Sequence, residues 1–76
     1  MLEEKVFEIF SKVMNFSRDK ISLKTTIEEV ENWDSVQHLN LILAIEEEFN
    51  VKFNPDEIQE MLSIEKIISN LKNKII

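Results

Sequence analysis

The sequence predicts an all-α fold, a small helical bundle of three main helices plus one short helix, with a long loop between the first and second helices. Apolar residues recur at helical spacing near both ends, a long apolar run fills the middle, and the single proline follows a helix-capping residue. The chain has 76 residues, no glycine and no cysteine, so residues 1–76 are expected to form one domain without disulfides. A hydrophobic fraction of 43% is enough for one compact core.

The first helix is expected over roughly residues 2–15, where charged residues alternate with apolar residues that share one face: Leu2, Val6, Ile9, Phe10 and Val13. Residues 16–34 are more polar and are expected to form the long loop. A long loop in a compact domain needs its own packing, which is expected from the apolar anchors Ile21, Leu23, Ile27, Val30 and Trp33. Within the loop, Thr26 and Glu29 form a capping-box pair and predict one helical turn around residues 27–30.

The second helix is expected from Ser35 to about Phe49. Asp34 is a favourable N-cap residue, and Gln37 three positions later completes a capping-box pattern. Asn50 gives an end signal. The apolar residues of this stretch form a broad stripe, which suits a helix at the centre of a bundle; they are Val36, Leu39, Leu41, Ile42, Leu43, Ile45 and Phe49.

Two further helices are expected after a short connection. The connection alternates in polarity but has no strand to pair with, so we expect it to be extended and to bury Val51 and Phe53. Asn54 and Pro55 then open a short helix that ends near Met61. The last helix has a serine cap, one apolar face and two lysines near its C-terminal end: Ser63, Ile64, Ile67, Ile68, Leu71, Lys72 and Lys74.

The charge balance limits which kinds of partner the protein is expected to bind. The net charge is −6, with 15 acidic against 9 basic residues, which argues against nucleic acid because phosphate backbones are bound mainly through Lys and Arg. A partner with a basic surface fits better. No stretch approaches the ~20 apolar residues that cross a bilayer, and the first residues lack the pattern of a signal peptide. We therefore expect a cytoplasmic protein without membrane contact, and no metal site is expected either.

Ser35 occupies the first position of the second helix, where unpaired backbone N–H groups and the helix dipole favour a bound phosphate. The motif Asp34-Ser35-Val36 precedes an apolar helix that closes in Glu-Glu-Glu-Phe at residues 46–49, and a Pro-Asp-Glu helix start follows at residues 55–57. This arrangement resembles the acyl carrier proteins over essentially the whole chain. Valine replaces the leucine that is usual in the family's Asp-Ser-Leu motif.

The resemblance implies a carrier rather than an enzyme. A 4′-phosphopantetheine arm from coenzyme A would be attached to Ser35, and Asp34 would cap the helix and be read by the phosphopantetheinyl transferase. The arm would hold acyl or aminoacyl groups as thioesters and present them to a loading ligase and to transferases or synthases. The carrier is expected to be a stand-alone monomer.

The partner-binding residues that the resemblance implies lie along the second helix: Val36, Gln37, His38, Asn40, Glu46 and Glu47. Gln37 and Asn40 are neutral where fatty-acid carriers usually have acids, and Trp33 stands where those carriers have a small residue. Both departures favour a specialised pathway (polyketide, nonribosomal peptide or polysaccharide-modifying) over a housekeeping fatty-acid carrier, which stays the alternative. A helical interaction module without a prosthetic group is the alternative from another class.

His38 invites comparison with a Ser-His catalytic pair, but a base three residues along the same helix lacks the orientation of a triad. A small serine hydrolase is therefore disfavoured, and His38 is interpreted as a solvent-facing or rim residue. The resemblance also implies that an acyl chain can enter the core between the second and third helices. The candidates for lining that pocket are Ile42, Ile45, Phe49, Ile58, Met61, Leu62, Ile64 and Ile68.

Overall fold

A computed structural model describes residues 2–75, which fold into four α-helices and two 3₁₀ turns, and within this range there is no β-strand. The elements are, in order, α1 (Leu2–Met14), η1 (Arg18–Lys20), η2 (Ile27–Glu29), α2 (Ser35–Phe49), α3 (Pro55–Glu60) and α4 (Ile64–Ile75). The predicted fold class is confirmed, and the helix bounds differ from the predicted ones by a residue or so. The turn η1 has no counterpart among the predicted elements.

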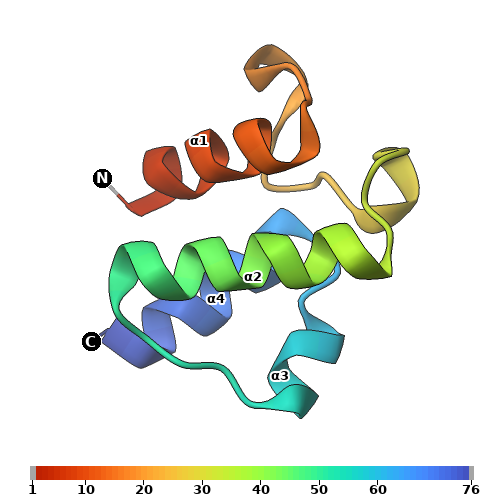
Figure 1. The fold of residues 1–76 in the computed structure, drawn as a ribbon. Helices are drawn as coiled ribbons and strands as arrows, with labels where there is room; N and C mark the ends of the chain where they lie inside the picture. The colour runs from red at the N-terminus through yellow and green to blue at the C-terminus, as the bar shows by residue number, and fades with distance from the viewer. Residues whose placement is uncertain (1, 76) are drawn as a thin grey trace.

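Helices α1 and α2 lie side by side and run in opposite directions, while α4 lies behind α2 in the view of Figure 1. The start of α1 meets the end of α2, where Lys5 Nζ lies 3.9 Å from Glu48 Oε2. The start of α2 meets the end of α1, where Gln37 Nε2 donates to the Val13 carbonyl at 2.9 Å. These contacts at opposite ends fix the antiparallel pairing.

Asparagines terminate α1 and α2. Asn15 and Asn50 adopt left-handed backbone conformations, with φ of 52° and 55°. Glycine is the usual residue at such a helix end, and asparagine is the common substitute because its side chain tolerates this region. The end signal read from Asn50 is confirmed.

One apolar core joins three helices and the long loop. Its buried side chains are Val6, Phe10, Met14, Ile21, Val30, Trp33, Leu41, Ile42, Ile45, Phe53, Met61, Ile64, Ile67, Ile68 and Leu71. The predicted apolar face of α4 is thus confirmed, as is the burial of Phe53. Outside α2, two expected core or anchor residues have exposed side chains, Leu23 and Leu62.

The broad apolar stripe expected on α2 is divided between two faces. Leu41, Ile42 and Ile45 are buried in the core, while the leucines and valine that alternate with them face solvent. The prediction that Val36, Leu39 and Leu43 belong to one core face is therefore wrong. A helix packed against neighbours on one side only cannot bury an apolar stripe this wide.

The long loop is tied to the start of α4 through backbone hydrogen bonds. The N–H groups of Ile64 and Glu65 donate to the carbonyls of Thr25 (2.9 Å) and Leu23 (3.1 Å), and Ile27 N–H donates to the Leu62 carbonyl (3.0 Å). These bonds satisfy N–H groups that a helix start leaves without an intrahelical partner. The loop is therefore an ordered part of the fold, and its end delivers Ser35 to the start of α2.

The connection after α2 and the start of α3 are fixed by short-range bonds. Glu46 Oε2 accepts a hydrogen bond from Phe53 N–H at 2.8 Å. Asn54 and Glu57 form a complete capping box: Asn54 Oδ1 accepts from Glu57 N–H (2.8 Å), and Glu57 Oε1 accepts from Asn54 N–H (2.9 Å). The predicted proline-led start of α3 is thus confirmed.

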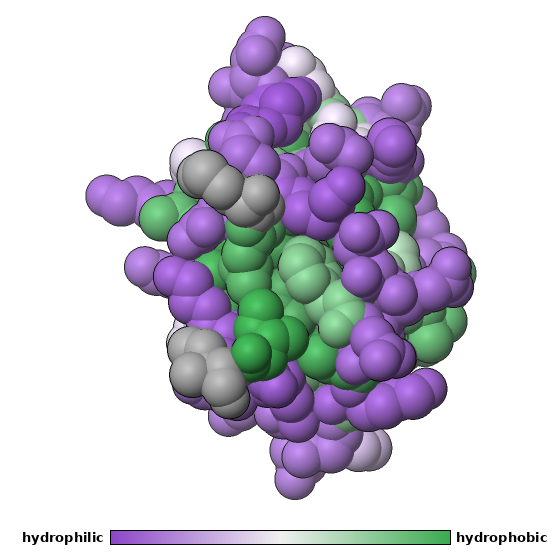
Figure 2. Space-filling view, turned by 90° about the vertical axis from the view of Figure 1, so that its left-hand side faces the viewer, coloured by the Kyte–Doolittle hydropathy of each residue, from purple (hydrophilic) through white to green (hydrophobic). Residues whose placement is uncertain are grey.

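Apolar side chains also reach the surface at the end of the molecule where α1 begins and α2 ends, as the green area of Figure 2 shows. Leu2, Phe49 and Val51 are half-buried there and pack against the core. Across the described residues, no helix is both long and apolar enough to cross a membrane.

Candidate functional site

The candidate site is the first turn of α2, which Asp34 caps. Asp34 has an extended backbone, its Oδ1 accepts from Gln37 N–H at 2.8 Å, and its carbonyl accepts from His38 N–H at 2.8 Å. The predicted N-cap is confirmed. The predicted capping box is only half made, because the Gln37 side chain reaches across to the Val13 carbonyl of α1.

Ser35 is exposed at the first helical position. Because Asp34 supplies the cap, the Ser35 hydroxyl is free to carry a substituent. The first N–H groups of a helix have no intrahelical carbonyl partner, and the dipole there favours an anion. The first turn of α2 itself contains no acidic residue. A phosphodiester on this hydroxyl therefore fits both the space and the local field.

His38 is buried, with only 8% of its surface exposed. Its Nδ1 accepts a 2.9 Å hydrogen bond from Trp33 Nε1, and its Nε2 lies 2.7 Å from the Ile58 carbonyl oxygen. The interpretation of His38 as a solvent-facing or rim residue is wrong, because its ring is held inside the fold. The same bonds leave no ring nitrogen for Ser35, which agrees with the exclusion of a Ser-His pair.

An apolar row lines the exposed face of α2 after Ser35. Val36, Leu39 and Leu43 are 68%, 54% and 60% exposed. Their spacing of three and then four residues places them on one side of the helix. Two partner-binding candidates near this row are neutral, Gln37 and Asn40. Asn40 is exposed, and its Nδ2 donates to Gln37 Oε1 at 2.8 Å.

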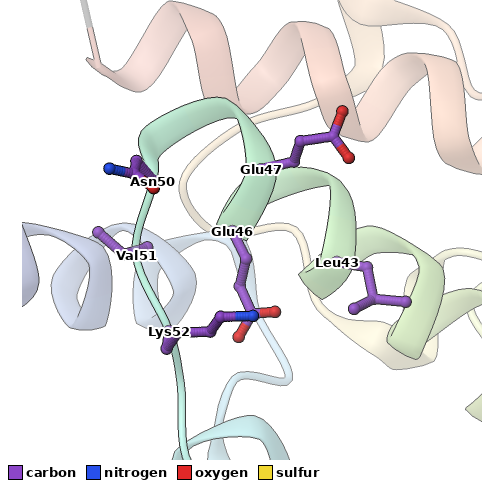
Figure 3. Close-up of a pocket in the computed structure, with 6 residues that line it drawn as sticks. All are labelled: Leu43, Glu46, Glu47, Asn50, Val51 and Lys52. Atoms are coloured by element: carbon purple, nitrogen blue, oxygen red, sulfur yellow. The ribbon is translucent and has the colours of Figure 1, made fainter.

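At the far end of α2 the surface is hollowed, with an open space of about 530 Å³ lined by Leu43, Glu46, Glu47, Asn50, Val51 and Lys52 (Figure 3). The two acids there are not equivalent. Glu46 is half-buried and accepts a hydrogen bond from the Phe53 N–H, whereas Glu47 is exposed and its side chain points in a different direction from that of Glu46 (Figure 3). Of the two predicted partner-binding acids, only Glu47 is therefore unencumbered by a bond within the fold.

The eight candidates for an acyl pocket fall into three groups. Ile42, Ile45, Met61, Ile64 and Ile68 are buried in the core cluster. Phe49 and Ile58 are half-buried against that cluster. Leu62 is 40% exposed and lines a surface hollow of about 450 Å³ beside the end of α3. Seven of the eight candidates thus lie in the core or pack against it, and Leu62 lies outside it.

Sequence reasoning missed the Trp33–His38 pair. A buried Trp nearly always needs an acceptor for its indole N–H, and His38, the single histidine, was the available nitrogen acceptor five residues away. That rule could have predicted the pair once Trp33 was assigned to packing. No group of acids and histidine within the described residues could hold a metal ion.

Comparison with known proteins agrees with this geometry. The family model described as the phosphopantetheine attachment site matches residues 4–71. The acyl carrier protein of Buchnera aphidicola subsp. Schizaphis graminum is 30% identical over 73 residues, covering 96% of this chain and 92% of that protein. The acyl carrier protein of Nitratidesulfovibrio vulgaris strain DP4 is 32% identical over 73 residues, covering 96% of each.

The holo acyl carrier protein of Geobacter metallireducens superposes with a TM-score of 0.85 at 23% identity, covering 96% of this chain and 84% of that one. A doublet acyl carrier protein from prodigiosin biosynthesis gives 0.80 at 18% identity, covering 96% of this chain and 35% of that one. At these identities the structures show the fold alone.

The fold and the exposed helix-start serine define a class of protein, the small helical carrier domains. Within that class, the matches show that the chain belongs to the phosphopantetheine attachment-site family and is an acyl carrier protein. It is therefore a carrier rather than an enzyme, and its prosthetic group is covalently attached 4′-phosphopantetheine. Members of this family interact with a phosphopantetheinyl transferase and with enzymes that handle acyl groups.

Proposed function

We propose that Ser35 is the attachment residue and that the chain is a stand-alone, single-domain, monomeric carrier of acyl or aminoacyl groups in the cytoplasm. One observation supports the attachment residue above all: Ser35 is exposed at the first position of α2 while its neighbour Asp34 does the capping. Asp34 therefore stabilises the start of the helix, and the Ser35 hydroxyl remains available for modification.

In the attachment step, Ser35 Oγ forms a phosphodiester bond with the phosphate that bears the pantetheine of coenzyme A. The pyrophosphate bond of coenzyme A breaks, 3′-phosphoadenosine 5′-phosphate leaves, and the serine proton passes to a base of the transferase or to solvent. The unpaired N–H groups at the start of α2 stabilise the new phosphodiester charge. The bound arm supplies the thiol that holds the cargo as a thioester.

Partner enzymes dock on the exposed face of α2. The apolar row Val36, Leu39 and Leu43 offers surface that is buried on contact, and Glu47 offers negative charge at the far end of the same helix. Such a face suits an enzyme with an apolar patch next to Ser35 and basic side chains farther away. It also holds the carrier in one orientation, with the arm near the partner's active site.

The charge distribution on α2 favours a specialised pathway, such as polyketide, nonribosomal peptide or polysaccharide-modifying synthesis. The first half of the helix presents neutral Gln37 and Asn40, which bond to each other, and Gln37 also bonds to α1. The housekeeping fatty-acid carrier is the alternative. Thioesters identified by mass on carrier isolated from its host separate the two, since long unbranched fatty acyl groups alone would contradict the specialised pathway.

Intact-mass spectrometry tests the attachment residue. The protein is incubated with coenzyme A and a promiscuous phosphopantetheinyl transferase, together with Ser35→Ala and the control Ser63→Ala. Ser63 also stands at a helix start, where its Oγ accepts from Lys66 N–H at 3.2 Å. We expect parent and Ser63→Ala to gain one phosphopantetheine and Ser35→Ala to gain none.

Modification of Ser35→Ala would show that the attachment residue is wrong. A parent protein that never gains mass, with a control carrier loaded in the same reaction, would instead favour a helical interaction module without a prosthetic group.

A further inference from the structure

Helix α3 is held in place by few contacts. It has six residues, Pro55–Glu60, and none of its side chains is fully buried. Its first turn is tied to α4, where Lys74 Nζ lies 2.8 Å from Glu57 Oε1. Its second half is tied to α2 by the 2.7 Å contact between His38 Nε2 and the Ile58 carbonyl oxygen. Polar contacts therefore provide much of the stabilisation of α3 that buried apolar side chains provide for the other helices.

The two bonds of His38 determine its proton arrangement. An indole N–H can only donate, so the 2.9 Å bond from Trp33 Nε1 requires an unprotonated His38 Nδ1. In a neutral imidazole the hydrogen then lies on Nε2, which donates to the Ile58 carbonyl. Trp33 itself packs edge-on against Phe10 of α1, with ring centroids 5.0 Å apart. One chain of contacts thus runs from α1 through the loop and α2 to α3.

We propose that His38 is a positioning residue that holds α3 against α2 and so sets how readily the interior opens to an acyl chain. The inference rests on the proposed function. A chain entering between α2 and α3 has to move the two helices apart, and this movement pulls the Ile58 carbonyl away from His38. The buried imidazole N–H is then left without an acceptor, and an unsatisfied buried donor costs more than the bond contributes. The bond therefore opposes opening.

Nuclear magnetic resonance of the unloaded protein tests the bond itself. The chain has one tryptophan and one histidine, so the signals of both rings are assigned without ambiguity. We expect a neutral imidazole with its hydrogen on Nε2, and a scalar coupling between Trp33 Nε1 and His38 Nδ1 across the hydrogen bond. A hydrogen on Nδ1, or no coupling, overturns the proposal.

Amide hydrogen exchange tests the effect on α3. His38→Leu removes both bonds, and His38→Gln keeps one acceptor and one donor. Val6→Ala is the control, because Val6 lies in the core on α1 and its truncation weakens the fold without touching α3. Relative to amides of α1, we expect those of residues 58–61 to exchange about tenfold faster in His38→Leu, the scale of one lost hydrogen bond. His38→Gln should restore most of the protection.

Equal acceleration in α1 and α3 would show that His38 merely stabilises the whole fold, and would overturn the proposal. If His38→Leu does not fold, Trp33→Phe replaces it. That variant removes the indole donor and also some of the packing against Phe10 of α1, while it keeps the contact between His38 and Ile58. We expect a smaller acceleration of exchange than in His38→Leu, still larger in α3 than in α1. If exchange in that variant is not selectively faster in α3, the result counts against the proposal.

The loaded protein tests the consequence for cargo. Parent and His38→Leu are loaded with an acetyl or an octanoyl arm, and cleavage of the thioester by hydroxylamine is timed. We expect the octanoyl thioester to be cleaved several-fold more slowly in His38→Leu than in parent, and the acetyl thioester at equal rates. Equal octanoyl rates overturn the proposal. Failure of the parent to load is a different result, since it counts against the proposed carrier function, while the exchange data still test whether His38 holds α3 against α2.

Discussion

In the first turn of α2, Asp34 caps the helix, and the proposed function places attachment on its neighbour Ser35. Ser35→Ala should change the free energy of unfolding by no more than about 0.5 kcal/mol, the usual scale for a surface site. Asp34→Ala should cost about 1 kcal/mol, because the Gln37 N–H loses its acceptor. Urea unfolding of both variants beside the parent measures the difference.

Asp34→Asn sharpens this comparison, since it keeps a capping oxygen and removes the charge. We expect its stability to be near that of the parent and its loading by the transferase to be slower. Loading of Asp34→Asn at the parental rate would mean that Asp34 acts only as the helix cap. A large loss of stability in Ser35→Ala would contradict the assignment of the cap to Asp34.

The role of a residue could be predicted from the sequence where its hydrogen-bond partner lies nearby in the chain, and could not be predicted where that partner lies far away in the chain. Asp34 caps a helix that begins one residue later, so its role is visible in a short pattern. Gln37 and His38 bond to carbonyls 24 and 20 residues away, on α1 and α3. A local pattern does not contain those partners, and for this reason the half-made capping box and the burial of His38 escaped the sequence analysis.

At the scale of elements, the charge at the far end of α2 should control docking. Glu47→Lys should slow acyl transfer by a partner enzyme that docks through basic side chains, and added salt should shrink the difference. Glu46 is unsuitable for this test, because it holds the Phe53 N–H. Asp19→Lys in η1 makes the same change of net charge on an exposed residue away from α2. Equal slowing in both variants at low salt would leave α2 without a special role.

The start of α3 should respond to acid through Glu57. The Lys74 ammonium, and second the Asn54 backbone N–H, hold the pKa of Glu57 below its ordinary value of 4.5. A lowered pKa in the folded state means that the carboxylate stabilises the fold above pH 4.5. This contribution is lost as the pH falls through the lowered value.

Glu57→Gln keeps the capping box and removes the charge. The parent should therefore be more stable than this variant near neutral pH, and the two should converge in acid below the pKa of the folded carboxyl. Urea unfolding of both proteins across that range measures the gap. A gap that stays constant with pH would mean that the Lys74 contact contributes nothing.

Periodicity predicted α1 and α4 well because each has one apolar face and one polar face. Periodicity could not separate the buried apolar residues of α2 from the exposed ones, because more than half of the residues in this helix are apolar. Which of them are buried depends on where α1, α3 and α4 pack, and that arrangement is a property of the assembled fold. Periodicity therefore places Val36, Leu39 and Leu43 on the core-facing stripe, although the three form an exposed row next to Ser35. Only Val36 is also a partner-binding candidate from the resemblance.

At the scale of the whole molecule, the net charge of −6 should make stability depend on ions. Self-repulsion of excess acids destabilises a compact state. Millimolar Mg²⁺ at low ionic strength should raise the melting temperature, by about 4–8 °C for each kcal/mol gained in a domain of this size. Na⁺ at equal ionic strength is the control and should give a smaller rise. A melting temperature indifferent to both ions would argue against repulsion as a significant cost.

The two left-handed helix ends at Asn15 and Asn50 also bear on the unfolded chain. Glycine would adopt these backbone angles more easily, but it would add conformations to the unfolded ensemble. Because asparagine makes both turns, every residue of the chain has a side chain that restricts its backbone. The unfolded state thus has less conformational entropy to lose. Part of the stability of this small bundle comes from the stiffness of its disordered chain, which no contact in the folded structure records.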